Sequence, residues 1–201
     1  MKTIRLFHII SLFTFLVITV SCEKLIDEFY LTDEIRQQIP FNGKEEISFI
    51  NNNGDETILI AGDRVDEIHK EFDCINCKDY YYIETEKIQI KNELYEIGLE
   101  LIAADQGSLS IRFALEDINF GCVFANLPLS ENSLKHDETY YDSLIINNKA
   151  YYEIYGDTLL HHEGNIPINP YPTLIFYSTN FGVVKIDFSD GSYWELDKVD
   201  W

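Results

Sequence analysis

Two groups of cysteines stand where a thiol could do chemistry. Cys22 ends an apolar run near the N-terminus, and Cys74 and Cys77 form a C-x-x-C motif. Such a motif acts as a redox pair when a helix N-terminus lowers the pKa of its thiols. Here Asp73 and Asp79 lie beside the motif, and acidic neighbours raise the pKa of a thiol. We therefore interpret Cys74 and Cys77 as a structural disulfide, as is typical of an oxidising compartment.

Other interpretations of the motif remain open. A metal knuckle would need two further ligands. His161 and His162 are adjacent, so their side chains rarely face the same way, and no second C-x-x-C is present. The remaining alternative is a pair of free thiols, or exchange with Cys122. Cys122 shares its strand parity with Phe120 and Phe124 and is expected in the core.

The sequence carries no motif of a catalytic site. The G-x-S-x-G pattern of a nucleophilic serine and the P-loop pattern do not occur. Carboxylates are so numerous that a close pair is expected by chance and does not indicate glycoside hydrolysis. The Asn-rich segment 51–56 lacks the order of a calcium loop and is expected to be a turn. We therefore expect a protein that is not an enzyme, with no catalytic residue, no metal and no cofactor.

Tyrosines are the candidates for ligand binding. The chain has 13 Tyr, and several of them stand in adjacent runs. Neighbours on a strand point to opposite faces, so each run is expected to expose a ring. Tyr81, Tyr141 and Tyr151 are the candidate rings for stacking on a sugar or a protein. The alternative is that these tyrosines only fill strand positions, which tyrosine favours.

The first 22 residues have the pattern of an export signal. Lys2 and Arg5 precede an apolar run, Leu6 to Val20, which is shorter than a membrane span of about 20 residues. The run ends in Thr19-Val20-Ser21-Cys22. This ending resembles the lipobox of bacterial lipoproteins, in which a small residue precedes an invariant cysteine. The alternative is an ordinary cleaved signal with Cys22 present by chance.

The resemblance implies a lipid anchor on Cys22. The thiol would carry a diacylglyceryl group, the signal would be cut before Cys22, and the new amine would be acylated. Each buried CH₂ contributes about 0.8 kcal/mol, so several acyl chains hold a protein on a membrane essentially permanently. The expected location is the bacterial cell envelope, at the outer membrane or the cell surface, with the membrane as a partner through Cys22.

Net charge excludes one class of partner. The chain has 15 basic and 35 acidic residues, and its formal net charge is −20. Phosphate binding needs a basic face, so nucleic acid is not expected as a partner. An acidic surface is also repelled by anionic lipid, so attachment would depend on the anchor.

Alternating apolar residues indicate strands, and two hairpins fix a register. In the first, we expect a two-residue type I′ loop at Asn53-Gly54, which would pair Phe49 with Ile58. Ile47 and Ile60 would then pair on the same face. In the last hairpin, a three-residue loop at 189–191 best aligns the apolar faces. It would pair Ile186 with Trp194 and Val184 with Leu196, with Gly191 in the left-handed region.

The whole pattern predicts an all-β fold. About ten strands joined by tight turns would form an antiparallel meander, arranged as a sandwich or a half-open barrel. A short helix is expected within 25–38, capped by Thr32. Segments 62–79, 127–138 and 160–171 are expected to be irregular loops. The expected organisation is a signal peptide at 1–21, a tether with the short helix at 22–39 and one all-β domain at 40–201.

These features favour a membrane-anchored module outside the cytoplasm. It would be a non-enzymatic binding or structural protein with a protein or glycan partner. One alternative is a lipocalin-like carrier that holds an apolar ligand inside its curved sheet. Another is a surface glycan-binding module that uses exposed tyrosines.

Overall fold

The protein is described by a computed structural model. It describes residues 23–72, 74, 78–103, 107–115, 120–128, 139–163 and 170–201. For residues 120–128 and 159–163 only the backbone is described.

The described residues form thirteen strands and one short helix. In chain order these elements are β1 (Lys24–Phe29), α2 (Asp33–Arg36), β2 (Glu46–Asn51), β3 (Glu56–Ala61), β4 (Val65–Phe72), β5 (Asp79–Lys91), β6 (Tyr95–Ile102), β7 (Ser108–Leu115), β8 (Phe120–Pro128), β9 (Thr139–Ile146), β10 (Lys149–Glu163), β11 (Pro172–Ser178), β12 (Gly182–Phe188) and β13 (Tyr193–Asp200). The predicted all-β class is confirmed.

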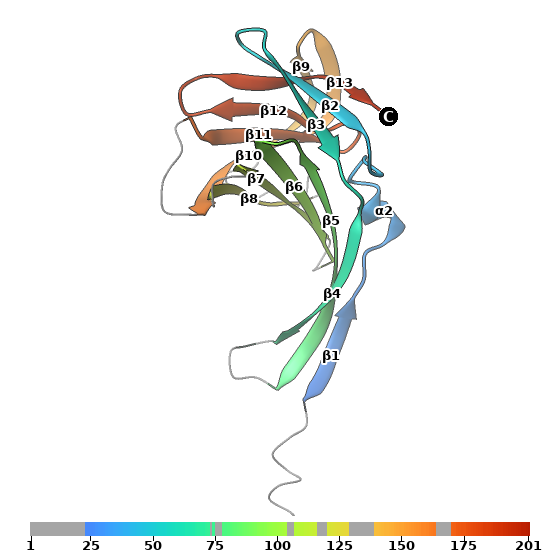
Figure 1. Ribbon diagram of the computed structural model, residues 1–201. Helices are drawn as coiled ribbons and strands as arrows, with labels where there is room; N and C mark the ends of the chain where they lie inside the picture. Colours follow the sequence, from blue (N-terminus) through green and yellow to red (C-terminus); the bar gives the residue numbers. More distant parts are fainter. Residues whose placement is uncertain are drawn as a thin grey trace, which may run out of the picture.

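One sheet contains all the strands and folds over into two layers. Its order is β1-β5-β3-β2-β13-β12-β11-β10-β8-β7-β6, with β4 on β5, β9 on β10 and an additional pairing of β5 with β6. All the pairings are antiparallel except that of β1 with β5. In Figure 1, β11, β12 and β13 lie over β6, β7 and β8.

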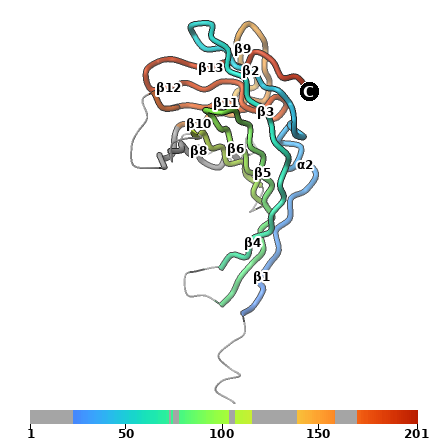
Figure 2. Tube along the Cα trace, viewed as in Figure 1, coloured from blue at the N-terminus to red at the C-terminus, as the bar shows by residue number. Residues whose placement is uncertain are grey.

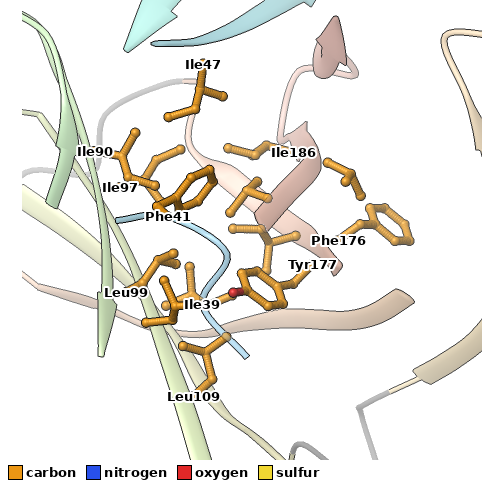
Figure 3. Close-up of a cluster of buried hydrophobic side chains, with 14 of the residues drawn as sticks. Ile39, Phe41, Ile47, Ile90, Ile97, Leu99, Leu109, Phe176, Tyr177 and Ile186 are labelled. Carbon is orange, nitrogen blue, oxygen red and sulfur yellow. The ribbon is translucent and has the colours of Figure 1, made fainter. Parts of the chain in front are cut away.

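The core lies between these layers. Figure 3 shows Leu99 of β6 and Ile186 of β12 directed into the same interior, and both are buried. Ile39 and Phe41 enter this interior from the segment that follows α2. The hydroxyl of buried Tyr177 donates to the carbonyl of Gln38 at 2.6 Å, which fixes that segment against β11.

The register predicted for the first hairpin is wrong by one residue. Ile47 pairs with Leu59 and Ser48 with Ile58, so the loop has three residues and ends in Gly54, whose φ is 88°. Leu59 is therefore buried, whereas Ile58 is 39% exposed. The longer loop is stabilised by the side chain of Asn51, whose Oδ1 accepts hydrogen bonds from the backbone of Asn53 and Asp55.

The register predicted for the last hairpin is confirmed. Ile186 pairs with Trp194, and Gly191 has a φ of 83°. The amide of Gly191 donates to the carbonyl of Phe188 at 3.0 Å, which closes the turn. Asp190 Oδ1 accepts from both the backbone and the hydroxyl of Ser192, at 2.9 and 2.6 Å.

The predicted N-terminal helix is only partly right. Thr32 caps a helix as expected, because its Oγ1 accepts from the amide of Ile35 at 3.3 Å. The helix is confined to Asp33–Arg36, and Lys24–Phe29 forms strand β1 instead. Residues 24–29 are extended and not helical because they pair with the free edge of β5.

The three predicted loops contain more strand than expected. Segment 62–79 holds all of β4, β8 continues to Pro128, and β10 continues to Glu163. Strand β4 escapes a pattern-based prediction because nearly all of it is exposed. A strand that is solvated on both faces needs no alternation of apolar and polar residues.

Candidate functional site

A three-stranded arm projects from the sandwich. We define the arm as β1, β4 and residues 79–84 of β5, which pair with one another and not with β6. Figure 1 shows the arm extending away from the stacked strands, and Figure 2 shows the same departure in the chain trace. Residues 85–91 of β5 stay in the sandwich, where they pair with β6.

The far end of the arm is where the N-terminal segment joins it. Lys24 pairs with Asp79, and the amide of Lys24 donates to the carbonyl of Lys78 at 3.1 Å. Cys22 lies outside the described residues, and only Glu23 separates it from β1. Lipidation of Cys22 therefore stays a prediction, but the attachment point of that segment is fixed at the end of the arm.

The predicted disulfide also falls at this end. Cys74 lies between β4 and β5, in the connection that closes the arm, and it is disulfide-bonded. Cys77 lies outside the described residues, so its pairing with Cys74 stays a prediction. The side chain of Cys122, on β8, is likewise outside the description.

A network of charges holds the root of the arm. The carboxylate of Glu86 is only 3% exposed and lies between two guanidinium groups. Arg36 Nη1 lies 2.5 Å from one of its oxygens, and Arg64 Nη1 lies 2.6 Å from the other. Arg36 also binds Glu84 at 2.8 Å and Asp66 at 2.7 Å. The hydrogen bond to Asp66 makes the largest contribution to raising the pKa of the Arg36 guanidinium.

The same arginines fix the segment that enters the core. Arg64 donates to the carbonyls of Phe41, at 2.7 Å, and of Ile39. The amide of Leu31 donates to Glu84 at 2.8 Å. These residues were not among the sequence-predicted sites. Their spacing carries no local signal, because Arg64 and Glu86 are separated by 22 positions.

A groove lined by both charged and apolar side chains lies beside the root of the arm. It has a volume of about 700 Å³. Its lining comes from β4, β5, β6 and β7 and from the connection between β3 and β4. Because Ile88 and Ile90 of β5 are buried in the core, the alternating Lys87 and Gln89 face this groove. Gly98 of β6 also lines it and contributes no side chain, which helps to leave the space open.

Five charged side chains that line the groove form ion pairs with one another. Lys87 Nζ lies 3.0 Å from Glu67 and 3.3 Å from Glu100, and Arg112 lies 3.7 Å from Glu96. The hydrogen bond between Lys87 and Glu67 raises the pKa of the lysine and lowers that of the carboxyl group. The groove therefore offers donors and acceptors that are held in place, and among the described residues that line it there is no His or Cys to act as a base or nucleophile.

The three candidate tyrosines do not form one site. Tyr81 lies on the arm, where its ring packs edge-on against Phe29 with centroids 5.9 Å apart. Tyr141 lies on β9 near Phe176. Tyr151 is only 3% exposed. Its hydroxyl donates to a backbone carbonyl of β13 at 3.3 Å, and burial raises its pKa. The proposed stacking role of Tyr151 is therefore wrong, because its ring serves the core.

Among the described residues, no group of three or more His, Cys, Asp or Glu side chains is arranged to hold a metal ion. Over the same residues, no helix has the length and apolar content to cross a membrane. Comparison of the chain with protein-family models, with curated proteins and with solved structures finds no match.

Proposed function

We propose that this chain is a bacterial lipoprotein, anchored to a membrane outside the cytoplasm, that acts as a non-enzymatic binding or structural module. Cys22 carries the lipid, and the arm separates the sandwich from the membrane. One observation carries the proposal. Strand β1, which begins two residues after Cys22, starts at the end of the arm that is farthest from the sandwich. An anchor on Cys22 would therefore attach at the point of the arm that lies farthest from the sandwich, so the membrane would not contact the sandwich.

The length of the arm supports this arrangement. Residues 79–84 of β5 lie in the arm, and these strand residues span about 20 Å at a rise of about 3.3 Å each. An upright arm would hold the sandwich and its groove clear of the lipid headgroups. The groove would then face the aqueous space, where a partner can reach it.

The groove supports a binding role with a polar partner. Four acidic residues line it, Asp63, Glu67, Glu96 and Glu100, against two basic ones, Lys87 and Arg112. A neutral or basic polar chain, such as a segment of another envelope protein, fits this balance better than an acidic one does. No aromatic ring is among the described residues that line the groove, so that lining lacks the stacking platform that a glycan-binding module commonly uses.

The carrier alternative has less support. In Figure 3, side chains from both layers and from the segment after α2 meet in the interior. Those side chains are buried and form one hydrophobic cluster. A carrier needs an apolar cavity in that place, so the packing favours a module that binds on its surface.

The anchor is tested by replacing the lipidated thiol. We expect the Cys22→Ser protein to lose acyl labelling and to leave the membrane fraction. Ser21→Ala is the matched control, because it keeps a small residue before the cysteine and should stay lipidated. Fractionation of cells, together with labelling by a radioactive fatty acid, measures both properties. A Cys22→Ser protein that remained in the membrane fraction would refute the proposed anchor.

A further inference from the structure

Apolar side chains form a row across the far end of the arm. Leu25 of β1 and Phe72 of β4 are both strand partners of Tyr80 of β5. Directly paired residues lie on the same face of a sheet, so the three side chains stand side by side. Leu25 is 38% exposed and Phe72 is 45% exposed. We call Leu25, Tyr80 and Phe72 the end row.

The surroundings of the end row have the composition of a membrane–water boundary. Ile26, at the irregularity of β1, is 52% exposed. Lys70 Nζ lies 4.0 Å from the ring centroid of Tyr80 and 5.0 Å from that of Phe72. Aromatic rings and lysines are enriched at this boundary, where a lysine keeps its stem on apolar surface and its charge in water.

The end row is also at the right distance from the proposed anchor. Cys22 precedes Leu25 by three residues, which span at most about 11 Å. The headgroup layer on each side of a bilayer is roughly 5–8 Å thick. A lipid on Cys22 would therefore place Leu25 in or at the headgroups. Ile68 lies four residues along β4 from Phe72 and would stand about 13 Å farther out, in water.

We propose that the end row docks into the headgroup region of the membrane to which Cys22 is anchored. This inference rests on the proposed function and adds a second membrane contact, made by the protein itself. The two contacts together would hold the arm upright, whereas an anchor alone would let it tilt. Glu23, Glu71 and Asp79 lie near the same end, so the preferred surface is zwitterionic and not anionic.

Quenching by brominated lipids tests this contact. The lipidated full-length protein is reconstituted into phosphatidylcholine vesicles with bromine on the acyl chains. Phe72→Trp is compared with Ile145→Trp, which places a tryptophan on exposed β9 in the sandwich. The parent already contains Trp194 and Trp201. The tryptophan fluorescence of the parent is therefore subtracted from that of each variant. We expect quenching of the Phe72→Trp signal to be at least roughly twofold stronger, because docking side chains reach about 5–10 Å into the headgroup boundary.

Two further variants keep the test decisive. Leu25→Trp probes the same row from β1 and replaces the first variant should Phe72→Trp fail to fold. Ile68→Trp should be quenched no more than Ile145→Trp, because it stands above the headgroups. Equal, weak quenching at all four positions in vesicle-bound protein would overturn the docking and leave the anchor intact. Quenching equally strong at Ile145 would mean that the protein lies flat, which also overturns it. Failure of the protein to bind vesicles at all would instead refute the proposed function.

Discussion

Gly182 offers the sharpest test of how the N-terminal segment is packed. It begins β12 with a φ of 78°, a conformation that side chains rarely adopt. A Cβ at this position would lie 2.4 Å from Cζ of Phe41 and 2.5 Å from its Cε2. Phe41 is buried and stacks on Trp201, with ring centroids 5.9 Å apart. The change Gly182→Ala therefore forces the Phe41 ring to move.

Gly191 provides a matched control for the backbone effect. Its φ of 83° is close to that of Gly182, but a Cβ there meets no atom of the described residues within 4 Å. Gly191→Ala should lower the free energy of unfolding by about 1 kcal/mol, the cost of a left-handed alanine. Gly182→Ala adds overpacking of about 1–3 kcal/mol, for a total of about 2–4 kcal/mol. Since 1 kcal/mol shifts the melting temperature of such a chain by about 2–4 °C, the two variants should be readily resolved.

Urea unfolding measures the free energy of unfolding of both variants. A shift of the midpoint with an unchanged m-value reports a change in stability. A double variant isolates the contact, because Phe41→Leu removes the ring atoms that the new Cβ meets. In that background Gly182→Ala should cost only about 1 kcal/mol, the same as at Gly191. Losses at Gly182 and Gly191 that agree within about 0.5 kcal/mol in the parent would refute the packing of Phe41 against β12.

Two other changes probe the charges. Arg64→Met should lower the free energy of unfolding by about 3 kcal/mol, because Glu86 loses one of its two guanidinium partners in a buried site; a loss below about 1 kcal/mol in urea unfolding would contradict this. Hydrogen bonds from Ser192 lower the pKa of Asp190, so this carboxylate stabilises the fold above its unfolded pKa, and that contribution is lost as the pH falls through the folded pKa. Ser192→Ala should raise the pKa of Asp190 toward its usual value in an NMR titration, and an unchanged pKa would show that the hydroxyl has no effect.

The two Gly-containing hairpins show what the sequence pattern can and cannot fix. Residues 184–188 of β12 and 194–198 of β13 have their apolar side chains on one parity, so only one loop length aligns them, and the prediction was right. The stretch 57–61 is apolar at almost every position, so either face could be buried. The preference of Asn-Gly for a type I′ turn then decided the prediction. The hydrogen bonds of Asn51 select the longer loop, and Leu59 is buried in place of Ile58.

The arm and its root could not be predicted for a different reason. Along β4, charged and apolar residues follow one another with no buried face, because both faces are solvated. The ion pairs at the root join residues that are far apart in the chain, such as Arg36 and Glu86. No periodicity records such a contact. The end of the signal-like segment was visible in the sequence, but its position at the end of an arm depends on the pairing of β1 with β5.

Strand β1 links the stability of the arm to its proposed attachment. A two-stranded hairpin is marginal in water, and three strands are needed for independent stability. The β4–β5 hairpin gains its third strand from β1, which pairs in parallel from Lys24 to Phe29. The strand that completes the arm is thus also the strand that leads to Cys22. A force applied at an anchor on Cys22 would act first on the backbone hydrogen bonds between β1 and β5. It would then act on the hydrogen bond from the amide of Leu31 to the carboxylate of Glu84. The chain is therefore part of the folded arm from Lys24 onward, and the pairing of β1 with β5 places Lys24 at the far end of that arm.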